Sequence, residues 1–460
     1  MKENFDIEAL YKKMRSGQKE EVTGYAKEYG GDRHMRPTQV GMRVDKWVSK
    51  EGSKALVSVA KIPLAFQQKI VRTGVSFLFG EPVQRIPDEE GEAFALMDAL
   101  WGKNRLDHLL RIFAEKVQSE TQAALVFFEK KNKEGFLEIK ARVLSSENGQ
   151  LYPYFDEYGD MQAFGWEFER QSEGRAQSHL YVFTDHFLYV YLKGETQGGW
   201  VLDPEKSKPN LFRKIPVVYL SQDYPEWWEV KELIDRYEMT FSKFCDTNDY
   251  FASPMLMVKG AVDSLPQKDE TGKLLKLDIM ETERGNVVGA DVSYLTWDQA
   301  PEAIQLELEH ARSLIYALTD TPDLSLDNLK GLGGVPSGFA LQMLFMGAIV
   351  KAKWKEGEYS TVVSRAINIL KAGLSFTHPA LKGQIDSIGV KVKFSSILPQ
   401  NIQEIVRTLS EANGGKPLMS QAEAVRKNPL VEDPSKILEE LAEEAEREQM
   451  ESLSKSYQMS

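Results

Sequence analysis

Ile215-Pro216-Val217-Val218-Tyr219-Leu220 opens the stretch of sequence that decides the fold. This apolar run is typical of a buried strand, and a long helical segment, Glu226 to Phe251, follows it after a short loop. Pro254 ends that segment, and a second apolar run, Met255-Leu256-Met257-Val258, comes directly afterwards. A long helix between two strands is typical of a stalk that carries a separate unit at its far end.

The 226–251 segment is amphipathic, with apolar residues on one stripe and acids on its other faces. Such a stripe needs a partner, and residues 302–321 repeat the pattern, so we expect the two segments to pack as a helical pair. The predicted stripes are Val230, Leu233, Ile234, Tyr237, Phe241 and Phe244, and Ile304, Leu308, Ala311, Ile315 and Leu318. The acids, which we expect to be solvated, include Glu229, Glu232, Asp235, Glu238, Asp246 and Asp249, with Glu307 and Glu309 on the second segment.

The segment between the two helices, residues 254–298, is predicted to be a small β-rich tip. Glycines and a proline interrupt its apolar runs, as in short strands joined by turns. The expected strands are 256–258, 274–279, 287–288 and 292–295.

The chain before the stalk divides into three regions. Residues 1–50 are polar and rich in glycine, which predicts an extended N-terminal arm. Two helices are expected next, over 62–79, where Gly80 and Pro82 stop the first, and over 93–119. From 121 to 221 the apolar period changes to two, which predicts an antiparallel β unit. Its strands are expected at 123–128, 136–141, 151–155, 163–168, 179–183, 187–192 and 216–220.

The chain after the stalk begins with a glycine-rich loop over 321–338. A long helix from Ser337, with bends at Gly347 and Gly357, is expected to follow, and then a strand over 386–396. Residues 401–441 predict short helices, and a charged terminal helix from Lys436 is expected to fray after Met450. The predicted fold class is therefore α+β.

Bulk properties limit the possible functions. The chain has 460 residues, 57 basic and 69 acidic side chains and a net charge of −12, which argues against a broad basic face that grips nucleic acid. An acidic wall would instead let DNA slide past without tight, salt-sensitive attachment. The sequence has no apolar run long enough to span a bilayer and no signal peptide, so we expect a cytosolic protein without membrane contact. The single cysteine, Cys245, excludes an internal disulfide and is expected to serve packing.

A search for catalytic motifs finds none. The loop Gly331-Leu332-Gly333-Gly334 lacks the Gly-Lys-Ser/Thr of a phosphate-binding loop, and no Gly-x-Ser-x-Gly occurs. The six histidines form no zinc pattern. Asp320, Asp323 and Asp327 could bind Mg²⁺, but a solvated loop is the favoured interpretation. We therefore predict no catalytic residue, metal or cofactor.

Four residues are expected to be structural. His179 and His186 lie in predicted strands with apolar neighbours, which predicts packed histidines with satisfied hydrogen bonds. Trp227, with its neighbour Trp228, begins the stalk and predicts a packing contact at the start of the helix.

The order of these parts resembles the portal protein family of tailed double-stranded-DNA bacteriophages. The resemblance covers roughly residues 60–400. It is most specific at three places: Phe79-Gly80-Glu81-Pro82-Val83, Ile215-Pro216-Val217 with its helix, and Pro322-Asp323-Leu324-Ser325 with Ser337-Gly338-Phe339-Ala340-Leu341.

The resemblance implies an elongated subunit with an α/β wing, a two-helix stem, a β-rich clip, a long bent wing helix and an α-helical crown. Twelve copies would form a ring at one vertex of the capsid of a virion assembled in the bacterial host cytoplasm. The implied partners are other copies of the chain, double-stranded DNA, the terminase large subunit, the capsid and scaffolding proteins, and head-completion adaptors. By order, the parts are arm and wing 1–225, stem 226–253, clip 254–298, stem 299–321, tunnel loop 322–337, wing 338–398 and crown 399–460.

The resemblance also implies roles for individual residues. The stem acids would line or flank the DNA channel, and the clip would contact the motor and the connector proteins through Lys268, Asp269, Lys273 and Lys276. The tunnel loop would touch passing DNA, with Lys330 as its only base and its glycines allowing movement. The tunnel-loop residues are Asp323, Asp327, Asn328, Lys330, Gly331, Gly333 and Gly334.

Two other classes stay open. A nucleotide-dependent motor or a nuclease would need a phosphate loop or a metal-binding acidic set. A structural adaptor or scaffold protein without a pore would explain the acidic helices and the charged C-terminal region equally well.

Overall fold

The computed structural model divides into two compact units. The first takes in Met1–Asp323 and Gly347–Ser396, and the second Leu324–Met346 and Ile397–Ser460. The residues that the structure describes are 7–16, 22–30, 40–50, 53–172, 175–194, 199–251, 255–259, 262–264, 276–277, 280–281, 287–288, 291–295, 301–323, 342–395, 402–414, 418–431 and 434–458.

Helices rather than an extended arm begin the first unit, so that prediction was wrong. The described residues before the first strand include two short amphipathic helices, α1 (Ile7–Ser16) and α2 (Val22–Gly30). Each buries side chains against the β sheet or the helices beside it, and Met14, Tyr25 and Tyr29 are at most 6% exposed. A hairpin follows, made of β1 (Lys46–Lys50) and β2 (Ser53–Val57).

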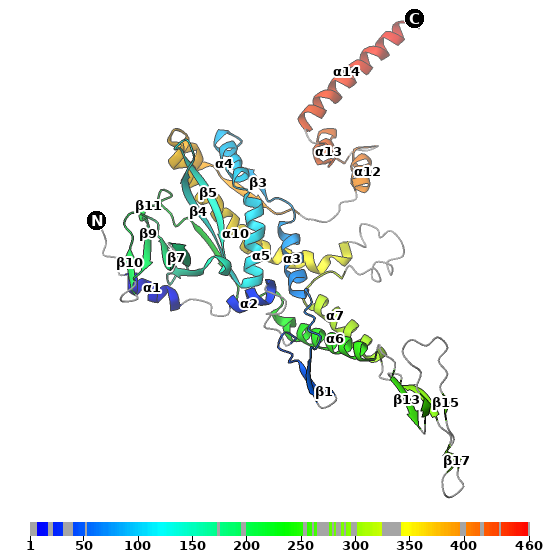
Figure 1. The fold of residues 1–460 in the computed structure, drawn as a ribbon. Helices are drawn as coiled ribbons and strands as arrows, with labels where there is room; N and C mark the ends of the chain where they lie inside the picture. Colours follow the sequence, from blue (N-terminus) through cyan, green and yellow to red (C-terminus); the bar gives the residue numbers. More distant parts are fainter. Residues whose placement is uncertain are drawn as a thin grey trace. The chain divides into compact units, whose positions relative to one another are not determined.

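Two sheets form the β unit, as the period of two predicts. The six-stranded antiparallel sheet runs β10-β9-β8-β7-β6, with β11 beside β9, and the three-stranded sheet runs β12-β4-β5 (Figure 1). All seven predicted strands are present. The strand bounds are β4 (Gln122–Lys131), β5 (Leu137–Leu144), β6 (Gln150–Phe155), β7 (Met161–Ser172), β8 (Arg175–Phe183), β9 (Phe187–Lys193), β10 (Trp200–Leu202), β11 (Lys208–Pro209) and β12 (Val217–Ser221), with the 3-10 turn η1 (Ser146–Asn148) before β6.

A helical layer packs on the three-stranded sheet through the main hydrophobic core. The long helix α10 (Met346–Thr377) crosses behind β4 and α5 in Figure 1, and side chains such as Phe113, Phe127 and Leu370 are completely buried between these elements. The other helices are α3 (Phe66–Phe79), α4 (Glu92–Lys103) and α5 (Leu106–Glu120). The single helix predicted over 93–119 is two helices because Arg105 adopts a left-handed backbone conformation, with φ 52°.

The last part of the first unit departs from the predicted strand over 386–396. Residues 382–387 form α11 (Lys382–Ser387) after the 3-10 turn η3 (Pro379–Leu381), and only β19 (Val390–Lys393) is a strand. It pairs antiparallel with β3 (Gln84–Pro87), which joins two segments far apart in the sequence.

The described residues between 255 and 295 form three antiparallel strand pairs, which confirms the four predicted strands and adds β14 and β16, which were not predicted. The pairs are β13 (Met255–Lys259) with β18 (Asp291–Leu295), β14 (Val262–Ser264) with β15 (Lys276–Leu277), and β16 (Met280–Glu281) with β17 (Val287–Val288).

Helices make up the second unit over residues 402–458, as predicted. They are α12 (Ile402–Asn413), α13 (Gln421–Lys427) and α14 (Pro434–Gln458). The terminal helix continues past Met450, where fraying was expected, and ends at Gln458. Two ion pairs four residues apart lie along it, Lys436 with Glu440 at 3.9 Å and Glu443 with Arg447 at 3.2 Å. None of the described helices is both long and apolar enough to cross a membrane.

Candidate functional site

The predicted helical pair is present as α6 (Lys231–Phe251) and α7 (Pro301–Leu318). The 3-10 turn η2 (Trp228–Val230) precedes α6, so the regular helix begins five residues later than predicted. Ile234 and Ile315 are completely buried. Across the pair, the Arg236 guanidinium donates to Glu307 at 2.7 Å, and this hydrogen bond lowers the pKa of Glu307. Leu318 was wrongly placed in the α7 stripe, since it is 63% exposed.

The α6 helix also binds an extended segment, residues 59–64, along a different side. The backbone N–H groups of Ala60, Ile62 and Leu64 donate to Asp246 (2.6 Å), Ser242 (3.1 Å) and Glu238 (2.6 Å) in turn. Every second residue of the segment thus meets every fourth residue of the helix. The spacings match, because four helical residues rise about 6 Å and two extended residues span about 6–7 Å.

This contact corrects two predictions. Helix α3 was expected from residue 62, but it begins at Phe66 because the preceding residues stay extended to bond α6. The acids of α6 were expected to be solvated, yet Asp235 and Glu238 are 8% and 0% exposed. Asp246 is half-buried and binds the Arg43 guanidinium at 2.6 Å. The expectation holds for the exposed Glu229, Glu232 and Asp249, and for Glu309 on α7.

The start of the stalk is held by α2. Glu28, 1% exposed, accepts from the Trp227 indole N–H at 3.0 Å and lies 3.3 Å from the Lys231 ammonium. The Trp227 ring, completely buried, stacks on Tyr29 with centroids 5.8 Å apart. The packing role predicted for this tryptophan is confirmed.

A buried charged cluster joins both helices of the pair to α10. Glu226 lies 2.8 Å from the Lys351 ammonium and 2.6 Å from that of Lys355, and its side chain is 9% exposed. Lys351 also donates to the carbonyl of Thr319, just after α7, at 3.0 Å. Burial opposes ionisation of Glu226, but the two ammonium groups outweigh it and lower its pKa. We call these four residues the base cluster.

Asp320 and Gly347 bring the two ends of the predicted tunnel loop together. Asp320 adopts a left-handed conformation, with φ 54°, and a Cβ added at Gly347 would lie 2.9 Å from its Oδ1. Gly347 therefore permits a close approach, a role different from the predicted bend. The Asp323 carboxylate lies 4.0 Å from the Arg312 guanidinium. Asp327, Asn328, Lys330, Gly331, Gly333 and Gly334 lie outside the described residues.

The residues predicted for connector contacts are mostly beyond what the structure describes. Lys268, Asp269 and Lys273 lie outside the described residues, and Lys276 begins β15. Their role stays a prediction.

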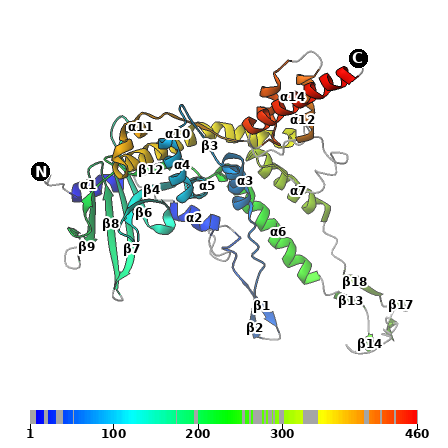
Figure 2. The same cartoon turned by 90° about the horizontal axis from the view of Figure 1, so that it is seen from above.

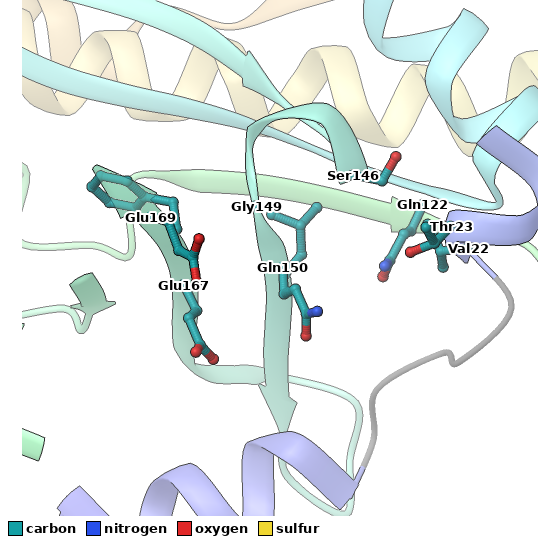
Figure 3. A pocket seen from close by; sticks show the side chains of 10 residues that line it. Val22, Thr23, Gln122, Ser146, Gly149, Gln150, Glu167 and Glu169 are labelled. Carbon is teal, nitrogen blue, oxygen red and sulfur yellow. The ribbon is translucent and has the colours of Figure 1, made fainter. Parts of the chain in front are cut away.

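A pocket of about 340 Å³ lies where the start of α2 meets the turn before β6 (Figure 3). No sequence pattern predicts this pocket, because its lining comes from four separate segments of the chain. Glu167 on its wall already accepts hydrogen bonds from the hydroxyls of Tyr11 and Tyr152, each at 2.8 Å. The lining is Val22, Thr23, Gln122, Ser146, Gly149, Gln150, Leu151, Glu167, Phe168 and Glu169.

The two strand histidines differ from their prediction. His179 is buried in β8 and stacks on Phe168, with centroids 5.3 Å apart, and burial lowers its pKa. Its ring nitrogens find no hydrogen-bond partner among the described residues, so the expected satisfied histidine was wrong. His186 lies in the turn before β9, 85% exposed and 2.9 Å from Asp185, rather than in a strand.

Reactive groups do not gather in the part of the chain that the structure describes. Within the described residues, no three or more His, Cys, Asp or Glu side chains are placed to hold a metal ion. Cys245 is half-buried on α6, and burial raises the pKa of its thiol, which makes the reactive thiolate scarcer.

A family model described as phage portal protein, SPP1 Gp6-like, matches residues 56–451. The chain belongs to this portal protein family. The match begins in β2 and ends in α14, so it includes the helical pair, the strands between its helices and most of each compact unit. The resemblance found in the sequence is confirmed. Portal proteins are structural components of phage particles rather than enzymes.

Other comparisons give only distant likenesses. No curated protein matches the chain. Among solved structures, the neck of a native GTA particle computed with C12 symmetry has a TM-score of 0.41 and 11% identity, and covers 91% of this chain and 98% of that one. The neck of an empty GTA particle computed with C6 symmetry has a TM-score of 0.41 and 11% identity, covering 89% and 95%.

Proposed function

We propose that copies of this portal-family chain form a ring-shaped channel at one vertex of a phage-like capsid. Terminase would drive double-stranded DNA inward through the ring, which would later retain and release it. The observation that carries the proposal is the family match over residues 56–451, which includes the whole α6–α7 pair. The fold of the subunit is α+β. We assign α6 and α7 to the stem, 254–298 to the clip, 322–337 to the tunnel loop and 399–460 to the crown.

The contacts of the helical pair suit a stem that resists mechanical force. Glu226 and its two lysines hold the base of α6 against α10, and Lys351 extends the same contact to the end of α7. Removing one partner of a buried ion pair costs about 3–5 kcal/mol, so such a cluster resists rotation of the stem against the rest of the subunit.

The charge of the stem suits passage of DNA better than tight binding. Exposed Glu229, Glu232, Asp249, Glu302 and Glu309 would repel phosphate where they face the channel. Few phosphate contacts mean little counterion release and hence weak attachment. We retain Lys330 as the proposed transient contact of the tunnel loop.

The proposed partners follow from this role. The clip would contact the terminase large subunit during packaging and head-completion adaptors afterwards. The wing and crown would face the capsid shell and its scaffold within the virion, after assembly in the host cytoplasm.

Native mass spectrometry of the purified full chain tests the proposal. We expect a closed assembly of one size, near twelve subunits. A monomer or dimer at micromolar concentration would favour the adaptor without a pore, and nucleotide turnover would favour a motor.

A further inference from the structure

The β1–β2 hairpin carries an apolar surface that the described part of its own chain leaves open. Trp47 pairs across the strands with Leu56, and the two side chains are 67% and 54% exposed. Val44, just before β1, is 82% exposed. A two-stranded hairpin is only marginally stable in water by itself, and an exposed tryptophan beside a leucine is costly to hydrate.

The base of this hairpin is nevertheless fixed. Arg43 binds Asp246 of α6 at 2.6 Å and also donates to the Ala60 carbonyl. Asp45 accepts from the Val59 N–H at 3.2 Å and lies 3.3 Å from Lys61. The hairpin is therefore held in a defined place on the stem while its apolar surface stays exposed.

A second exposed apolar surface lies on α7. Leu306, Leu314 and Leu318 follow one another at helical spacing and are 56%, 48% and 63% exposed. We call these three residues the outer α7 stripe. Around the helix, Leu306 lies opposite the buried Ile315, Leu314 lies about 100° from it and Leu318 about 60° from it.

The two surfaces lie on different sides of α6. On α6, Arg236 and Thr240 contact Glu307 of α7. Glu238, Ser242 and Asp246 of the same helix accept hydrogen bonds from the 59–64 segment. The centres of these two sets of residues lie roughly 140° apart around the helix axis. Figures 1 and 2 agree, with α6 between β1 and α7 in both views. The hairpin therefore cannot contact the outer α7 stripe of its own chain. It can contact the stripe of a neighbouring copy, head to tail. Heterologous contacts of this kind form a ring where the rotation between copies closes.

The charges of the two surfaces are complementary. Lys46 and Lys54 on the hairpin are exposed, and the outer α7 stripe is flanked by the exposed Glu302 and Glu309. Opposite charges at the rim of an apolar contact fix its orientation.

We propose that the β1–β2 hairpin of one subunit docks on the outer α7 stripe of the next copy in the ring, with Trp47 as its anchor. This rests on the proposed ring. The proposed contact specifies which two surfaces close the ring, and it places the hairpin between neighbouring stems.

Disulfide trapping between differently tagged chains tests the contact. In a Cys245→Ser background, one chain carries Lys54→Cys and the other, of different size, carries Glu309→Cys, so that Trp47 and the outer α7 stripe stay intact. After co-assembly and mild oxidation, we expect a mixed disulfide dimer on a non-reducing gel, and none from Tyr158→Cys with Glu309→Cys. Tyr158 is 84% exposed in the turn before β7 and serves as the matched control.

The outcomes separate this proposal from the ring itself. A ring without the mixed dimer, or with equal trapping from position 158, overturns the docking contact and leaves the ring standing. A Cys245→Ser parent that stays monomeric by native mass overturns both the docking contact and the ring.

As a second readout, Trp47→Ala should raise the protein concentration at the midpoint of ring assembly at least tenfold, while Tyr158→Ala leaves it unchanged. Unchanged assembly of Trp47→Ala contradicts the proposal.

Discussion

The base cluster and the β1–β2 hairpin both adjoin the α6–α7 pair and are built in opposite ways. At the base cluster, Glu226, Lys351 and Lys355 are largely buried and paired within one chain. At the hairpin, Trp47 and Leu56 are exposed, while Lys46 and Lys54 remain in solvent. The first contact is complete in the monomer, and the second awaits a partner. Substitutions at the base should therefore change folding, whereas substitutions at the hairpin should change assembly.

Glu226→Ala should have the largest effect on folding. It leaves two largely buried ammonium groups without their carboxylate, and breaking such a pair costs about 3–5 kcal/mol. Urea unfolding followed by circular dichroism should show the free energy of unfolding fall by about 3 kcal/mol, the low end of this range, because both lysine side chains are partly exposed. Glu229→Ala, an exposed acid three residues later, should stay within about 0.5 kcal/mol. Equal effects of the two substitutions would contradict the distinction.

The pH dependence of folding should reveal the same carboxylate. The folded-state pKa of Glu226 is lowered, so its contribution is complete above the unfolded value of about 4.3 and is lost as pH falls through the lower folded value. Glu226→Gln should remove this part of the acid-induced loss. Comparing the free energy of unfolding of the two proteins between pH 3 and pH 6 measures it, and parallel curves would argue against the pairing.

Asp246→Ala should have an intermediate effect, centred on the 59–64 segment. It removes the acceptor of the Ala60 N–H and the partner of Arg43, which we expect to cost about 1–3 kcal/mol. Hydrogen exchange of the Ala60 and Ile62 amides should accelerate markedly. Asp249→Ala, exposed on the same helix, should leave those amides protected, and loss of protection there would contradict the segment's attachment.

Two glycines of α10 should give the smallest effects, of opposite sign. Gly357 has open space around it, so Gly357→Ala should stabilise the helix by about 0.5–1 kcal/mol. Gly347→Ala should destabilise by about 1 kcal/mol, because its Cβ would meet Asp320 Oδ1. Thermal unfolding of both variants, and of Gly347→Ala with Asp320→Gly, gives the comparison. Asp320→Gly should offset the destabilisation caused by Gly347→Ala. If the double variant is as destabilised as Gly347→Ala alone, contact with the Asp320 side chain is not the cause.

The sequence predicts the elements well where periodicity reports burial. The stripes of α6 and α7 and the seven strands of the β unit follow from periods of 3.6 and 2, because one side of each element packs in the core. The motifs around Ile215 and Pro322 carried the family resemblance. Arg105, in contrast, splits a continuous helical pattern by its backbone conformation, which no period records.

The stem contacts could not be predicted in the same way. Glu226 and Lys351 are far apart in the sequence, and their pairing depends on how α10 packs. Glu238 borders the apolar stripe, four residues after Ile234, whereas the exposed Glu232 lies on the opposite side of the helix. The helical period does not reveal the extended segment beside α6, which presents the Leu64 N–H to Glu238.

Electron microscopy of the purified full-length protein tests the central claim most directly. We expect top views with a closed ring, a central channel and stems in side view, consistent with a portal. Uniform particles without a central hole, at concentrations where the chain is folded, would contradict the account.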